Sequence, residues 1–165
     1  MDFQIALLLG QDGLTNGAIY ALLALALVLV FAVTRVIFIP QGEFVAYGAL
    51  TLAMLQAGKL PATLWMIAAL GAAIVVIDGA IAIRHGAARR LPRIVLSNLG
   101  VPLALLFIVP NINAAGLPLV AQIALTLAVV VPLGPMIYRL AYQPIAEAPV
   151  LILLIVSVAV HVVLI

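Results

Sequence analysis

A long uncharged run from Gly13 to Thr34 is the feature that most constrains what this chain can fold into. At the helical rise of about 1.5 Å per residue, a run of this length crosses the roughly 30 Å of bilayer hydrocarbon. The rest of the chain has the same character, because hydrophobic residues make up 68% of its 165 residues and charged residues only 7%. A soluble domain normally carries about 25% charged residues. The sequence therefore predicts a membrane protein and excludes a water-soluble core.

Six apolar segments follow one another along the chain. Each ends in a turn rich in Gly, Pro, Asn or charged residues, where an apolar helix is expected to stop. The segments cover residues 14–39, 43–56, 61–83, 94–109, 117–138 and the residues from 149 onward. These lengths predict an all-α, polytopic integral membrane protein with about six transmembrane helices, of which the second is short or broken. No turn is long enough for a soluble domain, so residues 1–165 are expected to form a single transmembrane domain.

The second segment spans only about 22 Å as a helix, which leaves open whether it crosses the bilayer or dips and returns. The basic residues favour a crossing, since it places almost all of them on one side, as the positive-inside rule requires. If all segments cross, Lys59 lies on one side, and the other side holds Arg35, Arg84, Arg89, Arg90, Arg93 and Arg139. The basic loop 84–93 is then cytoplasmic and the amino terminus extracytoplasmic.

The break after the first segment predicts a transport path. Arg35 is followed by Pro40, Gln41 and Gly42 and then by the carboxylate of Glu43. Such an interruption at membrane depth is tolerated only where protein or a water-filled cavity shields the backbone. We therefore expect Gln41, Gly42 and Glu43 to belong to a substrate path or gate. The alternative for Glu43 is an interfacial charge that the helix dipole and Arg35 stabilise.

Two further features point to functional or packing roles within the membrane. Asp78 lies in an apolar stretch, and an intramembrane carboxylate is a functional hypothesis by default. Its alternative role is structural pairing with water or with an arginine of the loop that follows. Gly13, Gly17 and Ala21 recur every four positions on one helix face and predict close helix packing in lipid.

The sequence favours no enzymatic, metal or nucleotide site in this chain. Ser157 and His161 are four residues apart, but no third acid and no Gly-x-Ser-x-Gly turn accompanies them, so we predict no catalytic residues. His85 and His161 lack metal-ligand spacing, and the sequence contains no cysteine. No P-loop is present, so any ATP-driven activity needs a partner subunit. The basic residues lie in loops between apolar segments, which favours an orientation signal over nucleic-acid binding.

Several stretches resemble the amino-terminal part of the permease subunits of branched-chain amino acid ABC importers, the LivH type. The strongest are residues 16–22 (Asn-Gly-Ala-Ile-Tyr-Ala-Leu), 29–37 (Leu-Val-Phe-Ala-Val-Thr-Arg-Val-Ile), 41–44 (Gln-Gly-Glu-Phe) and 48–49 (Gly-Ala). The family usually has His at the position of Gln41, and Asn-Phe-Ala at residues 38–40. A weaker likeness to the family's Tyr-Arg-Pro-Leu element covers residues 142–145.

The resemblance implies a permease subunit of an ATP-binding cassette importer for branched-chain or other small amino acids. Its implied partners are a second permease subunit, cytoplasmic ATPase subunits that use the ATP, and an extracytoplasmic substrate-binding protein. It implies location in the inner membrane of a bacterium and, because family permeases are longer, an incomplete amino-terminal portion. The alternatives are an ion-coupled secondary transporter using Glu43 or Asp78 and a structural subunit that does not transport.

Overall fold

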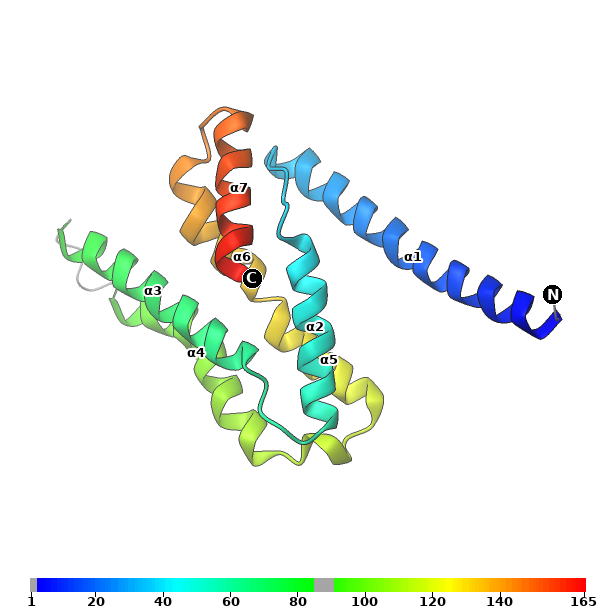
Figure 1. Cartoon of the computed structure of the whole chain (residues 1–165). Helices are drawn as coiled ribbons and strands as arrows, with labels where there is room; N and C mark the ends of the chain where they lie inside the picture. Colours follow the sequence, from blue (N-terminus) through cyan, green and yellow to red (C-terminus); the bar gives the residue numbers. More distant parts are fainter. Residues whose placement is uncertain (1–2, 85–90) are drawn as a thin grey trace. The chain divides into compact units, whose positions relative to one another are not determined.

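All regular structure in the computed structural model is helical over the residues that it describes, 3–84 and 91–165, which confirms the predicted all-α class (Figure 1). The elements are α1 (Phe3–Thr34), α2 (Gln41–Gln56), α3 (Thr63–Arg84), α4 (Leu91–Asn111), the 3₁₀ turn η2 (Ala114–Gly116), α5 (Leu119–Val130), α6 (Leu133–Ile137), the π-helical turn η3 (Tyr138–Tyr142), the 3₁₀ turn η4 (Gln143–Ile145) and α7 (Val150–Leu164). The predicted basic loop around Arg89 and Arg90 falls largely in residues 85–90, which lie outside the described part.

Within the described residues, four helices are long and apolar enough to cross a membrane. These are Phe3–Thr34, Thr63–Arg84, Ile94–Asn111 and the interrupted helix Leu119–Ile145. The helix α7 is apolar but shorter, and α2 has 16 residues, in keeping with the predicted short second segment. The fold therefore supports a multi-pass membrane protein.

Two sequence-based boundaries are wrong. The first helix begins at Phe3 and ends at Thr34, whereas the hydropathy pattern placed it at residues 14–39. It continues through Asp12 because a helix can carry a single charge on its surface. The fifth segment, predicted over residues 117–138, ends later, at Ile145, and is interrupted after Val130. Pro132 and Pro135 explain the interruption, since proline supplies no backbone N–H and crowds the preceding turn.

The described chain divides into two compact units, one formed by α1, the elbow up to Gln41 and residues 147–165, and the other by residues 42–146. In the first unit, α1 ends at Thr34, and the next residue, Arg35, has a φ of 56° in the left-handed region. Its amide still donates to the carbonyl of Phe31 at 2.8 Å. The Nε2 of Gln41 donates to the carbonyl of Leu23 at 3.2 Å, so a side chain beyond the elbow is tied back to the middle of α1.

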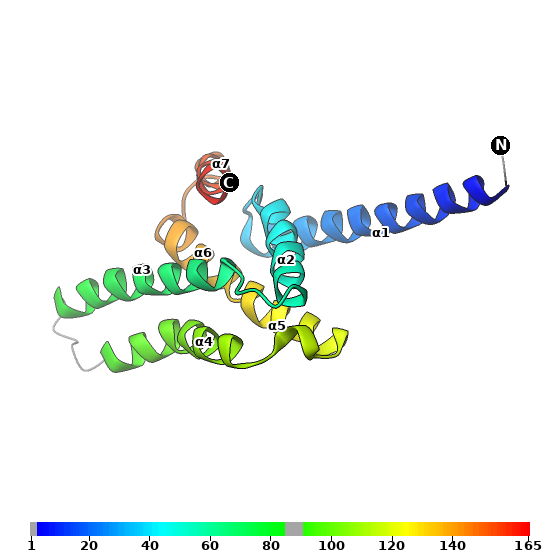
Figure 2. The ribbon, with the colours of Figure 1, turned by 60° about the horizontal axis from the view of Figure 1, so that its bottom comes forward.

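In the second unit, α3 and α4 run side by side, as both views show (Figures 1 and 2). Gly71 allows the close approach, because a Cβ there would lie 2.7 Å from the carbonyl oxygen of Asn98. The helices α5 and α6 also contact α3. The buried apolar side chains of this unit include Leu55, Leu64, Ile67, Ile74, Leu105, Val129, Leu133 and Tyr142.

A buried glutamine orders the entry to α5. The Nε2 of Gln122 donates to the carbonyls of Ala114 and Leu117, at 3.0 and 3.1 Å. Gln122 is 5% exposed, so these bonds satisfy an amide that would otherwise be costly to bury. The turn before α5 is thereby fixed to the helix that follows it.

Candidate functional site

A charged cluster joins three elements of the second unit. The Nη2 of Arg139 on η3 lies 2.5 Å from the Oδ2 of Asp78 on α3. The Nη1 of Arg139 donates to the Oδ1 of Asn98 on α4 at 3.1 Å. The side chain of Asp78 is 22% exposed and that of Arg139 42%. Charges within apolar helices are expensive unless they are paired, so this cluster is the leading candidate for a site.

Asn98 is held by bonds within its own helix. Its Nδ2 donates to the carbonyl of Ile94 at 2.8 Å and to the hydroxyl of Ser97 at 3.2 Å. These two contacts fix the amide so that its Oδ1 is presented to Arg139. A buried side-chain amide, 7% exposed, therefore aims an acceptor at the guanidinium.

The backbone of Asn98 is also unusual. Pro102 lies four residues later and has no N–H with which to bond the Asn98 carbonyl in the helical pattern. The missing side chain of Gly71 lets the α3 backbone approach this carbonyl closely, at a position where Cα–H···O contacts are common between helices. The crossing of α3 and α4 is thus set at the residue that also contacts Arg139.

A cavity of about 180 Å³ opens beside the cluster. Its polar lining residues are Ser97, Asn98 and Arg139, and the other lining residues are apolar or proline. The full lining is Ile74, Ser97, Asn98, Val101, Pro102, Pro132, Pro135, Met136 and Arg139. The prolines that interrupt α5–α6 and bend α4 therefore line the same space as the guanidinium.

The structure gives Asp78 the paired arrangement that the sequence analysis raised as its alternative role. Its partner is Arg139, far along the chain on η3. The expected partners were water or an arginine of the loop that follows α3, and most of that loop lies outside the described residues. One sequence signal could have found the partner Arg139. Asp78 and Arg139 lie near those ends of the third and fifth apolar segments that were predicted to share the cytoplasmic side.

Sequence reasoning missed Asn98 and Ser97 altogether. Both lie in the fourth apolar segment, where an isolated amide and hydroxyl are ordinary interhelical hydrogen-bonding residues. Only the three-dimensional proximity of α3, α4 and η3 distinguishes them. Pro102 is a proline expected to break or bend the fourth segment, and it also leaves the Asn98 carbonyl without its helical hydrogen-bond donor.

The three predicted elbow residues lie in the first turn of α2, outside the charged cluster. Gln41 donates to Leu23 in the first unit, as described above. Gly42 is exposed, and a Cβ there would meet no atom within 4 Å. Glu43 is half-buried and lies four residues before Tyr47, so that both side chains occupy one helix face. Their role in a gate or path stays a prediction.

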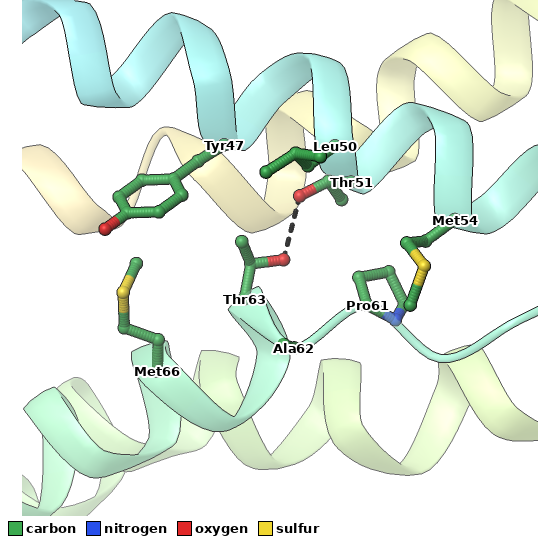
Figure 3. Close-up of a pocket in the computed structure, with 8 residues that line it drawn as sticks. All are labelled: Tyr47, Leu50, Thr51, Met54, Pro61, Ala62, Thr63 and Met66. Atoms are coloured by element: carbon green, nitrogen blue, oxygen red, sulfur yellow. Dashed lines mark hydrogen bonds between the residues drawn. The ribbon is translucent and has the colours of Figure 1, made fainter. Parts of the chain in front are cut away.

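A larger, apolar cavity of about 350 Å³ lies between α2 and α3 (Figure 3). The close-up shows Tyr47 and Met54 reaching it from α2 and Met66 from α3. The hydroxyls of Thr51 and Thr63 form a 2.8 Å hydrogen bond across the helices. Both threonines are buried, at 0% and 7% exposure, so the bond pins the two helices beside the cavity.

The small-residue face predicted on α1 lies open. A Cβ at Gly13 or Gly17 would meet no atom within 4 Å, and α1 buries none of its residues. The packing role of Gly13, Gly17 and Ala21 therefore stays a prediction.

Comparisons of the chain with protein-family models, with curated proteins and with solved structures gave no match. The features that bear on function are therefore the charged cluster, its cavity and the resemblance of the sequence motifs. Among the described residues, no three His, Asp or Glu side chains gather closely enough to hold a metal ion. The chemistry that the cluster offers is ion pairing and hydrogen bonding.

Proposed function

We propose that this chain is a membrane-spanning permease subunit of an ATP-binding cassette importer for branched-chain or other small amino acids. The observation that supports it best is the Asp78–Arg139 pair, held with Asn98 beside a cavity among apolar helices. Paired charges beside discontinuous helices are typical of solute pathways in membrane proteins. The motif resemblance around residues 16–44 supports the importer class.

In this proposal the chain guides the solute and performs no covalent chemistry. ATP is bound by cytoplasmic partner subunits, and a second permease subunit completes the path. An extracytoplasmic binding protein delivers the amino acid. The amino terminus faces outward from the inner membrane of a bacterium, in agreement with the distribution of basic residues.

An ion-coupled secondary transporter is the second candidate. The pairing of Asp78 argues against ion coupling through Asp78. A carboxylate that binds a proton or cation during the cycle should lack a permanent counter-ion. Asp78 already has one in Arg139. The other carboxylate considered for ion coupling is Glu43, which is half-buried at the start of α2.

The two candidates differ in their energy source. Uptake of radiolabelled L-leucine should be measured in membrane vesicles from cells that carry the gene and from cells that lack it. We expect gene-dependent uptake to persist with an uncoupler and to stop when ATP is withheld. Uptake that needs the proton gradient and ignores ATP would overturn the importer proposal.

The same assay tests the gate role of Glu43. We expect Glu43→Gln to change the uptake rate while the amount of protein in the membrane stays the same. Glu147→Gln is the matched control, because Glu147 is an exposed carboxylate in the turn before α7. Unchanged uptake with Glu43→Gln would leave Glu43 as an interfacial charge.

A further inference from the structure

We infer that the cavity between α3, α4 and η3 binds a small zwitterionic amino acid, and that Arg139 holds its carboxylate. The role of this site in transport rests on the function proposed above, whereas binding itself does not. No sequence motif pointed to Arg139, and its assignment comes from the geometry of the cluster.

Arg139 has hydrogen-bonding capacity left for a ligand. A guanidinium carries five N–H donors in a planar fork that suits a carboxylate. Asp78 lies on Nη2 and Asn98 on Nη1, which engages one donor of each nitrogen. The side chain is 42% exposed and lines the cavity, so the remaining donors can face a second carboxylate.

Net charge selects a zwitterion over a simple anion. Asp78 and Arg139 together carry no net charge, so a bare carboxylate bound beside them would leave one uncompensated negative charge among apolar helices. A zwitterionic amino acid adds none. Ser97 also lines the cavity, and its hydroxyl has two acceptor lone pairs, of which one receives the Nδ2 of Asn98. The other suits an ammonium group.

The size and walls of the cavity restrict the side chain of the ligand. At about 180 Å³ it is smaller than the roughly 300 to 1,000 Å³ typical of pockets for drug-sized ligands. Ile74, Val101 and Met136 supply apolar contacts on the walls away from the polar group. This combination fits a small aliphatic amino acid.

The backbone around Arg139 has a conformation that is frequent at functional sites. Arg139 lies in a π-helical turn, directly after the proline-interrupted α6. Single π-helical turns within α-helices occur frequently at functional sites. Here the turn carries Arg139, which contacts both Asp78 and Asn98.

Binding should be measured with the full chain, purified and reconstituted in lipid nanodiscs, by saturation-transfer NMR with L-leucine at millimolar concentration. We expect saturable binding. Isoamylamine, which keeps the side chain and ammonium but lacks the carboxylate, should not displace leucine. 4-Methylpentanoate, which lacks the ammonium, should displace it more weakly than leucine itself. Absence of saturable leucine binding, or equal displacement by isoamylamine, would overturn the assignment without any variant.

A charge swap separates ligand binding from structural pairing. In the double variant Asp78→Arg and Arg139→Asp the ion pair is restored, but the cavity presents a carboxylate in place of the guanidinium. We expect leucine affinity to fall by at least about tenfold in the swap and in Arg139→Gln, since hydrogen bonds to charged groups contribute about 1.5–3 kcal/mol. Arg84→Gln is the control, because Arg84 is an exposed arginine at the end of α3. Its affinity should not change.

The binding and uptake experiments give different outcomes if this inference fails and if the proposed function fails. Unchanged leucine affinity in the swap or in Arg139→Gln would assign Arg139 a structural role only, even where uptake remains ATP-dependent. Conversely, Arg139-dependent binding together with uptake that ignores ATP would keep the site and overturn the importer class.

Discussion

Gly71 and Asn98 hold α3 and α4 in backbone contact: a Cβ at position 71 would lie 2.7 Å from the Asn98 carbonyl oxygen. That oxygen belongs to backbone and cannot rotate away as a flexible side chain could. Because the same asparagine contacts Arg139, the spacing of two membrane helices and the position of the charged cluster depend on one glycine.

Gly71→Ala should therefore destabilise the protein by about 1–3 kcal/mol, the usual cost of overpacking. The matched control is Gly100→Ala on α4, where a Cβ would meet only the Leu96 side chain at an ordinary 3.7 Å. Equilibrium unfolding in mixed detergent micelles measures both variants. Equal stability of the two variants would mean that α3 and α4 are not in backbone contact at this point.

The Thr51–Thr63 hydrogen bond should appear as coupling between two substitutions. Thr51→Val and Thr63→Val each remove one partner of a buried bond and should cost about 1 kcal/mol. The double variant should cost less than the sum, by about 0.6 kcal/mol or more, as for other interhelical bonds in membranes. Thr126→Val is the control, because Thr126 bonds to Gln122 within its own helix. Additive costs for Thr51 and Thr63 would argue against this contact of α2 with α3.

Gly58 ends α2 in a left-handed conformation, with φ of 67°. The amides of Gly58 and Lys59 donate back to the carbonyls of Leu55 and Met54, the pattern of a Schellman cap. A Cβ at Gly58 meets only Ala115 at 3.8 Å, so the cost of Gly58→Ala is conformational, about 1–2 kcal/mol. Gly58→Asn should cost less, since asparagine tolerates this region. Equal losses of unfolding free energy in the two variants would contradict the cap.

Part of the fold and of the candidate site could be predicted from the sequence, and part could not. The apolar runs, the Pro-Gly break and the short second segment could be predicted, because span length and helix-breaking residues are local properties of the sequence. Asp78 could be singled out for the same reason. Its partner Arg139 and the connecting Asn98 could not, since their proximity depends on how α3, α4 and η3 pack. A break or bend near Pro132 and Pro135 could also be predicted, because proline disrupts a helix locally.

The topology can be tested with single cysteines, because the natural sequence has none. We expect Lys59→Cys to react with an impermeant maleimide in intact cells. Arg84→Cys and Arg35→Cys should react only after the cells are permeabilised, since the positive-inside rule places both arginines in the cytoplasm. Labelling of Arg35→Cys together with Lys59→Cys would mean that α2 dips and returns. Labelling of Arg84→Cys in intact cells would invert the orientation.

The central claim is that the cavity beside Arg139 is part of a solute path and is reached by water. The alternative is a contact among lipid-facing helices that water does not reach. Val101 and Leu103 test it on one helix, because they are almost equally exposed, at 50% and 53%, and only Val101 lines the cavity. The measurement is the rate at which a water-soluble thiol reagent modifies Val101→Cys and Leu103→Cys in membranes open on both sides. The account predicts fast modification of Val101→Cys, slowed by L-leucine, and little modification of Leu103→Cys. Equal rates at the two positions, or a Val101→Cys that stays unmodified, would contradict it.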